Sequence, residues 1–184
     1  MTHTEQYLLE VRSITHLIDH DAIERMAVEL SELKGKLYIV GLGGSLANAI
    51  HMAADLRKLC NIDAEAFDNI SEITARANDE GMHTIFNDWL SRMKARDALM
   101  VLSVGGGTGD VSMAIGESVF WASGKFFPVY GIVGPDGGMT AQYGTIVVKV
   151  PATERITPHT EAFQAVIWHL LVSHPLLQKN STKW

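Results

Sequence analysis

Residues 36–45 read KLYIVGLGGS and residues 98–109 read ALMVLSVGGGTG, two short apolar runs that each end in a glycine-rich loop. A stretch with helical spacing of apolar residues follows each loop. This succession of strand, glycine loop and helix is typical of βαβ units, in which the strands are parallel. We therefore predict buried strands over residues 36–40 and 98–103.

The same alternation continues outward from these two runs. Further strands are expected at residues 64–67, 129–133 and 145–150, and helices at residues 45–60, 82–93, 110–123 and 157–174. Two more helices are expected before the first strand, with apolar stripes at Leu8, Val11, Ile14 and Ile18, and at Ile23, Met26, Ala27, Leu30 and Leu33. Asp21 and Glu24 form a capping-box pattern at the start of the second.

The predicted fold is a doubly wound α/β domain with a five-stranded parallel sheet in the flavodoxin-like order 2-1-3-4-5 and helices on both faces. The 184 residues, 47% of them hydrophobic, suit one domain. Within it we expect N-terminal helices for packing or oligomerisation (1–34), an α/β core (35–175) and a tail (176–184). This strand order brings both glycine loops to the switch point where open α/β sheets bind ligands.

Composition excludes several classes of protein. The net charge of -6, with 21 acidic and 15 basic residues, argues against a nucleic-acid-binding protein. Every apolar stretch is far shorter than the roughly 20 residues of a membrane helix, so we expect no membrane span. The single cysteine, Cys60, cannot form an internal disulfide, and the chain shows no secretory signal pattern. A cytoplasmic protein is the expectation.

The two glycine loops are suited to binding an anion. Glycines permit close backbone approach, and the N-termini of the following helices present free N–H groups, to which Ser45, Ser103 and Thr108 add hydroxyls. Leu46 and Asp110 stand where a dinucleotide fingerprint needs its third glycine, and neither loop has a P-loop lysine. A phosphate monoester fits better, although tight turns without a ligand would give the same pattern.

Several motifs agree in order and spacing with one known family. Residues 41–55 read GLGGSLANAIHMAAD, and further agreement lies at Thr74 and Ala75, Asn78 and Asp79, Phe86, and residues 103–115, 131–138 and 161–169. On these motifs the chain resembles the SIS-domain sedoheptulose-7-phosphate isomerase (phosphoheptose isomerase) family. That family includes non-catalytic relatives that associate with the bacterial replication initiator.

The resemblance implies a binding site for a phosphorylated sugar. The substrate-binding residues would be Gly43, Gly44, Ser45, Asn78, Asp79, Ser103, Val104, Gly105, Thr108 and Glu161. It also implies a divalent metal at His51, Asp55, Glu161 and His169. Zinc is expected there, although such a donor set also accepts manganese or iron. By resemblance the protein would be a tetramer with sites at subunit boundaries.

The implied reaction is the isomerisation of sedoheptulose 7-phosphate to D-glycero-D-manno-heptose 7-phosphate, or of a close analogue, through an enediol. Glu161, His169 and Asp55 are the catalytic candidates. Our hypothesis makes Glu161 the carboxylate base or an additional metal ligand, and His169 its acid–base partner, with His51 and Asp55 as metal ligands. The alternative function is a non-catalytic SIS protein that binds a sugar phosphate or a protein partner.

Spacing sets limits on this site. His51 and Asp55 are four residues apart, so one helix face carries both. Glu161 and His169 are eight residues apart, about 12 Å along a straight helix. Either that helix is kinked, or a neighbouring subunit completes the site, which is the interpretation we prefer. A satisfied core histidine remains the simpler alternative for His169.

The chain departs from the family pattern at five positions. Asp55 replaces glutamate, Glu161 replaces glutamine, Leu42 replaces asparagine, Gly105 replaces a phosphate-binding serine and Pro158 replaces aspartate.

Other residues receive structural interpretations. His83, His159 and His174 are interpreted as surface or local hydrogen-bonding residues. The large side chains of Phe163, Ile167 and Trp168, together with the N-terminal stripes, exceed what one sheet face needs, so a homo-oligomer is expected.

Overall fold

The computed structural model describes residues 1–182 and contains one five-stranded parallel sheet. Its strands are β1 (Leu37–Val40), β2 (Ala64–Ala66), β3 (Ala98–Ser103), β4 (Val129–Val133) and β5 (Ile146–Lys149). Their order, β2-β1-β3-β4-β5, confirms the predicted doubly wound topology. Because β1 and β3 are neighbours, paired from Leu37 with Ala98 to Val40 with Val101, the loops that follow them start side by side.

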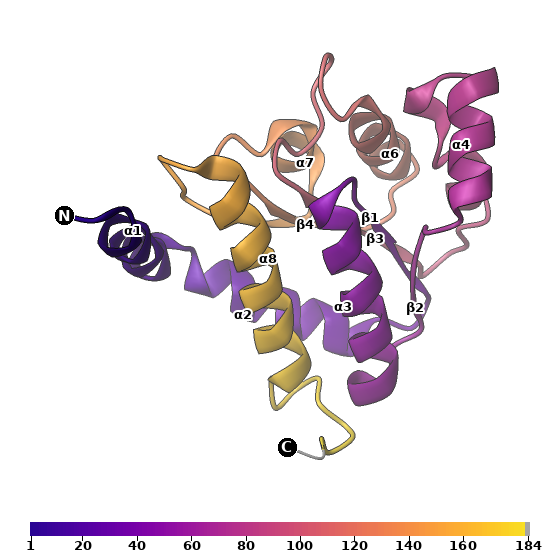
Figure 1. The fold of residues 1–184 in the computed structure, drawn as a ribbon. Coiled ribbons are helices and arrows are strands. Elements are labelled where there is room, and N and C mark those ends of the chain that lie inside the picture. The colour runs from indigo at the N-terminus through magenta and orange to yellow at the C-terminus, as the bar shows by residue number, and fades with distance from the viewer. Residues whose placement is uncertain (183–184) are drawn as a thin grey trace.

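Helices cover both faces of the sheet (Figure 1). One layer contains α1 (His3–Leu17), α2 (His20–Glu32), α3 (Gly44–Cys60) and α8 (Ile156–Ser173). The other contains α4 (Ile70–Asp79), the short 3-10 helix η1 (Met82–Thr84), α5 (Asn87–Leu90), α6 (Met113–Gly124) and α7 (Gly138–Tyr143). In the first layer α3 and α8 pack side by side, so residues of both helices meet near the carboxyl edge of the sheet.

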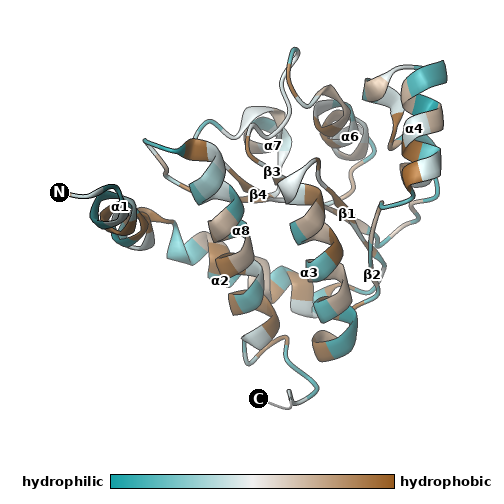
Figure 2. Cartoon of the chain, viewed as in Figure 1, coloured by the Kyte–Doolittle hydropathy of each residue, from teal (hydrophilic) through white to brown (hydrophobic). Residues whose placement is uncertain are grey.

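The sheet divides the core in two. Along β3, Met100 and Leu102 face the layer of α3 and α8, whereas Leu99 and Val101 face the layer of α6. All residues of β1, β3 and β4 are buried, and these strands are mostly hydrophobic in Figure 2. Burial on both faces explains why they read as continuous apolar runs rather than as alternating patterns.

The helix ends differ from the sequence expectation. Asp19, and not Asp21, caps α2, because its side chain accepts a hydrogen bond from the Ala22 N–H at 2.9 Å.

Other helices differ in their extent. The expected helix at 110–123 begins only at Met113, since Ser112 has a left-handed backbone with φ of 57°. The expected helix at 82–93 is broken into η1 and α5. Helices α4, capped by Asn69, and α7 were not predicted.

The expected tail packs on the body of the protein as far as the described residues reach. Leu177 is buried, and the amides of Lys179 and Asn180 both donate to the carbonyl of Leu59 at the end of α3. Residues 183–184 of that segment lie outside the described residues. Within residues 1–182, no helix has both the length and the hydropathy that a bilayer crossing requires.

Two interpretations of large or titratable side chains were wrong. Phe163, Ile167 and Trp168 are buried inside the subunit, so they give no argument for an oligomer. His159 is neither on the surface nor in a local hydrogen bond, because its side chain is 0% exposed and its Nε2 donates to Glu10 of α1 at 2.7 Å.

Glu10 attaches α1 to the first turns of α8. Its carboxylate also pairs with Arg155, the residue immediately before that helix. The hydrogen bond from His159, assisted by Arg155, holds the pKa of Glu10 below its ordinary value. The N-terminal helix is therefore tied to the helix that carries several candidate site residues.

Candidate active site

The first glycine loop, residues 41–45, leads from β1 directly into α3. Gly43 has a φ of 59°, a left-handed conformation that favours glycine, and α3 begins at the next residue. Ser45 lies in the first turn and is 2% exposed. The N–H groups of Leu46 and Ala47 donate to the Gly43 carbonyl, which leaves those of Gly44 and Ser45 at the positive end of the helix dipole without a backbone partner among the described residues. This loop therefore presents anion-binding groups on a fixed helix end.

The second glycine loop, residues 103–109, is fixed mainly by backbone contacts. The Gly106 N–H donates to Ser103 Oγ at 3.0 Å, and Gly106 has a φ of 69°. The amides of Met139 and Thr140, at the start of α7, donate to the carbonyls of Gly107 and Gly106. A side chain at Gly106 would collide with the carbonyl of Gly137. The base of this loop is therefore held by the segment that follows β4.

The tip of the second loop is more open. Thr108 is exposed, and its hydroxyl donates to the Val111 carbonyl at 3.1 Å and accepts from the Val111 N–H at 2.9 Å. Gly105 has no positive φ, and a side chain there would meet nothing within 4 Å. Val104 is half-buried, and its carbonyl accepts from the Gly134 N–H. Of the predicted binding residues here, Ser103, Val104 and Gly105 lie at the base and Thr108 at the tip.

Asn78 and Asp79 lie at the end of α4, in the opposite layer from α3 and α8. Both are exposed, and the Asn78 amide donates to the Asp79 carboxylate at 2.7 Å. Among the described residues this hydrogen bond joins the two side chains to each other and to neither glycine loop, so their role in lining the pocket stays a prediction.

The structure brings three of the predicted metal residues together. His51 and Asp55 on α3 and His169 on α8 place one donor atom each within 4.8 Å of one another. The His51 Nε2 lies 3.7 Å from an Asp55 carboxylate oxygen. His169 is exposed, so the interpretation of it as a satisfied core histidine is wrong. Two histidines and a carboxylate thus form a compact cluster between the two helices.

The surroundings of this cluster orient its side chains. His169 Nδ1 donates to the Ala165 carbonyl at 2.8 Å, which leaves the lone pair of Nε2 available. The Trp168 ring packs against the rings of both His51 and His169. The Asp55 side chain is 20% exposed and that of His51 60% exposed. The cluster is therefore walled on one side by an indole and open to solvent on the other.

This donor set fits a divalent metal. Two imidazoles and one carboxylate with an open remaining side match the ligand types and number of catalytic zinc sites. The hydrogen bond on Nδ1 of His169 is the outer-shell contact that ligating histidines usually make. The residues present can therefore hold such an ion.

Glu161 lies apart from the cluster, at the end of α3 that the first glycine loop leads into. A side chain at Gly44 would collide with the Glu161 carboxylate, so that carboxylate sits at the start of α3. His169 follows two turns later on α8, which is the separation expected of a straight helix. Within one subunit, the metal-type cluster of the described residues therefore comprises His51, Asp55 and His169 without Glu161.

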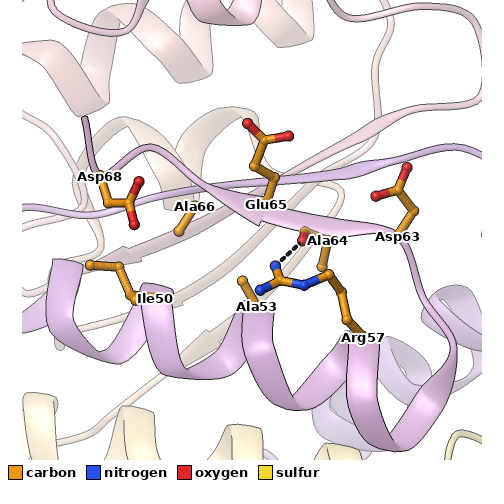
Figure 3. Close-up of a pocket in the computed structure, with 8 residues that line it drawn as sticks. All are labelled: Ile50, Ala53, Arg57, Asp63, Ala64, Glu65, Ala66 and Asp68. Atoms are coloured by element: carbon orange, nitrogen blue, oxygen red, sulfur yellow. Dashed lines mark hydrogen bonds between the residues drawn. The ribbon is translucent and has the colours of Figure 1, made fainter. Parts of the chain in front are cut away.

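A surface hollow of about 400 Å³ lies between α3 and β2 (Figure 3). Its acidic lining residues are Asp63, Glu65 and Asp68, and its one basic residue, Arg57, donates to the backbone carbonyl of Ala64. Figure 3 shows Glu65 pointing away from Arg57, across the strand. The acidic lining disfavours a phosphorylated ligand, so this hollow is not the expected substrate site.

Sequence reasoning missed three residues that shape the site, namely Asn48, Gln164 and Trp168. Gln164 is fully buried among the apolar residues of α8 and donates to Ser45 Oγ at 3.1 Å. One signal was available: a polar residue inside a stripe of buried apolar side chains needs hydrogen-bond partners. Its two side-chain partners, Asn48 and Ser45, lie 116 and 119 residues away in the sequence, so no local pattern identifies them.

Comparisons with known proteins agree with this architecture. No protein-family model matches the chain. The phosphoheptose isomerase of Rhodospirillum rubrum is 33% identical over 144 residues, which cover 74% of this chain and 73% of that protein. The lincomycin biosynthesis protein LmbN of Streptomyces lincolnensis is 31% identical over 150 residues, which cover 73% of this chain and 54% of that protein.

A solved structure shares the fold. The phosphoheptose isomerase GmhA from Neisseria gonorrhoeae matches with a TM-score of 0.80 over 92% of both chains, at 23% sequence identity. Fold similarity alone would not identify the family. The sequence similarity to the Rhodospirillum rubrum enzyme, over most of both proteins, shows that the chain belongs to the phosphoheptose isomerase family.

Proposed function

We propose that the protein is a phosphosugar isomerase of the cytoplasm that interconverts sedoheptulose 7-phosphate and D-glycero-D-manno-heptose 7-phosphate, or a close analogue. The observation that carries the proposal is the cluster of His51, Asp55 and His169 on two adjacent helices, one of which starts at a glycine loop. Family membership adds independent support, because a relative with 33% identity is a phosphoheptose isomerase.

The two glycine loops would hold the phosphate. Hydroxyls of Ser45 and Ser103 and the free N–H groups at the start of α3 are suited to its oxygens. Thr108 would complete the site after its local turn with Val111 opens or adjusts. The seven-carbon chain would then run along α3, because the cluster lies two to three turns from Ser45 on that helix.

The chemistry is a proton transfer between neighbouring carbons. A base removes a proton from C1 of the ketose, and the carbonyl oxygen at C2 gains one, which gives the enediol. Loss of the O1 proton and protonation of C2 then give the aldose. Carboxylates and histidines suit these transfers, so Glu161 would act as the base and His169, through Nε2, as its acid–base partner. A divalent cation, expected to be zinc, would be held by His51 and Asp55, and it would polarise the substrate oxygens.

A homotetramer with shared sites remains part of the proposal. Large apolar side chains are exposed on α1 at Leu8, Leu9 and Leu17, and on α8 at Val166 and Leu170. Burial of these side chains between subunits would remove apolar surface from water next to the candidate site. A neighbouring subunit could then bring its Glu161 to the cluster from which this subunit's own Glu161 is separated.

The test is the reaction itself. Purified protein, analysed for metal, is incubated with sedoheptulose 7-phosphate, and formation of the aldose heptose 7-phosphate is followed by NMR. We expect conversion by the wild type and at least a hundredfold slower conversion by His169→Gln, the order lost with an acid–base group. His174→Gln, the same exchange at the end of the same helix but away from the cluster, should keep wild-type activity.

The outcomes separate the alternatives. Sugar-phosphate binding without conversion by the wild type would contradict the isomerase and favour the non-catalytic interpretation. If the protein converts only a different phosphosugar, the isomerase reaction of the proposal holds and its substrate is a different sugar.

A further inference from the structure

A buried amide network joins the first glycine loop to α8. Gln164 is 0% exposed, and its Nε2 donates to Ser45 Oγ at 3.1 Å and to the Ile132 carbonyl at 3.4 Å. The Asn48 Nδ2 donates to Gln164 Oε1 at 3.0 Å and to the backbone carbonyl of Glu161 at 2.9 Å. The network therefore connects α3, α8 and β4.

The orientation of both amides follows from their partners. The carbonyls of Ile132 and Glu161 can only accept, so the nitrogens of Gln164 and Asn48 must face them. Gln164 then uses both N–H groups and its carbonyl oxygen in hydrogen bonds. A fully satisfied buried network of this kind holds one arrangement of the groups that it joins.

The consequence for Ser45 concerns the direction of its hydroxyl hydrogen. Its oxygen already accepts from Gln164, so the hydrogen is left to donate elsewhere, and Ser45 lies in the first turn of α3, where the anion is expected. A hydroxyl that accepts one hydrogen bond is also a stronger donor of another.

We propose that Gln164 is a positioning residue for the sugar phosphate: it sets Ser45 as a donor to the phosphate. Together with Asn48, Gln164 also fixes the spacing between the first glycine loop and His169, which lies five residues further along α8. This inference rests on the proposed function, because it assumes that Ser45 contacts the substrate phosphate.

The first test separates positioning from a general structural role. In Gln164→Met, which keeps length and volume but cannot donate, KM for sedoheptulose 7-phosphate should rise about tenfold and kcat change less than about threefold. The dissociation constant of inorganic phosphate, measured by calorimetry, should rise by a similar factor. Ser118→Ala removes a buried hydroxyl of α6 that bonds only within its own helix, and it should leave KM unchanged.

A double-mutant cycle identifies Ser45 as the residue through which Gln164 acts. In a Ser45→Ala background, Gln164→Met should change KM by less than about twofold, because the group that it orients is already missing. An equal rise in KM in both backgrounds would overturn the inference.

A second variant keeps the test informative if Gln164→Met folds poorly. Gln164→Glu is isosteric, but its ionised carboxylate only accepts, so it would draw the Ser45 hydrogen away from the phosphate. The rise in KM should be largest at high pH and diminish as the pH falls and the introduced carboxyl becomes protonated. A pH-independent KM equal to that of the wild type would contradict the proposal.

Failure of the proposed function looks different. Wild-type protein that neither converts the sugar nor binds inorganic phosphate would remove the function, and the inference with it. Wild-type activity with an unchanged KM in Gln164→Met would remove only the inference.

Discussion

The two glycine loops resemble each other in sequence but are held in different ways. In the first, the helix begins at Gly44, and the hydroxyl of Ser45 is buried and bonded to a distant helix. In the second, the helix begins only at Met113, and Thr108 is exposed and bonded within its own turn. A loop that leads directly into a helix fixes the orientation of its hydroxyl side chain, whereas a longer loop leaves the side chain at its tip free to reorient.

Under the proposed function, this difference suits each loop to a separate task. The first loop is rigidly connected to α8, which carries His169, and so it is suited to fixing the substrate relative to the reacting groups. The second loop has a backbone-fixed base near Gly106 and an open tip, so it is suited to closing over the phosphate. Preorganised groups lose less entropy on binding than mobile ones, so the first loop should contribute more per hydroxyl.

The largest expected effect comes from the base of the second loop. Gly106→Ala places a side chain against the Gly137 carbonyl at a positive φ, and it should lower stability by about 3 kcal/mol. The displaced loop should lower kcat/KM about a hundredfold. Gly105→Ala, one residue earlier with open space around it, is the matched control. Thermal unfolding and steady-state kinetics measure both effects, and equal behaviour of the two variants would show that the loop base is not rigid.

The next effect compares the two hydroxyls directly. Ser45→Ala should raise KM about tenfold, because a preset donor is lost. Thr108→Val should raise KM only about twofold to threefold, because its hydroxyl must first leave Val111. Measured KM values in the reverse order would break the distinction between a preset and an adjustable loop.

A smaller effect in the opposite direction is expected from Gly105→Ser. The position has an ordinary φ and no atom within 4 Å of a new side chain, so serine should fit without strain. Its hydroxyl would add a phosphate donor, which should lower KM about threefold. Gly109→Ser, at the equally open end of the same loop, controls for a general effect of an added hydroxyl. A KM that rises in Gly105→Ser alone would place the phosphate away from this position.

The smallest effect concerns the pH dependence of the contact between α1 and the start of α8, the helix to which the first loop is bonded. The pKa of Glu10 is lowered in the folded protein by His159 and Arg155, so its contribution to stability is present above its ordinary pKa. That contribution is lost as the pH falls through the lowered value. Hydrogen exchange at the start of α8 should therefore increase in acid before exchange at α6 does. Glu10→Gln should abolish this difference, and an unchanged acid response in that variant would contradict the assignment.

Much of the fold could be predicted because its signals are local. The runs at β1, β3 and β4 are continuous and apolar, and the strand order follows from repeated right-handed crossovers. The start of α6 was misplaced because the left-handed Ser112 and the turn of Thr108 depend on backbone geometry that residue types leave open. α4 was missed although its sequence is amphipathic, because the helix has only 10 residues and buries none of them.

The part of the site that follows from spacing along a helix could also be predicted. The four-residue spacing of His51 and Asp55 placed both on one helix face, and His169 joins them because α3 and α8 are adjacent. The separation of Glu161 from His169 followed from helix geometry alone. The network of Gln164 could not be predicted, since it depends on side chains that only the packing of three elements brings together.

The most direct test of the central claim is incubation of the protein with sedoheptulose 7-phosphate in deuterium oxide, with NMR detection of deuterium in the sugar. Proton transfer through an enediol predicts aldose product with deuterium at C2, from the wild type and not from His169→Gln. Bound sugar phosphate that remains unconverted and gains no deuterium would contradict the claim that this site is an isomerase.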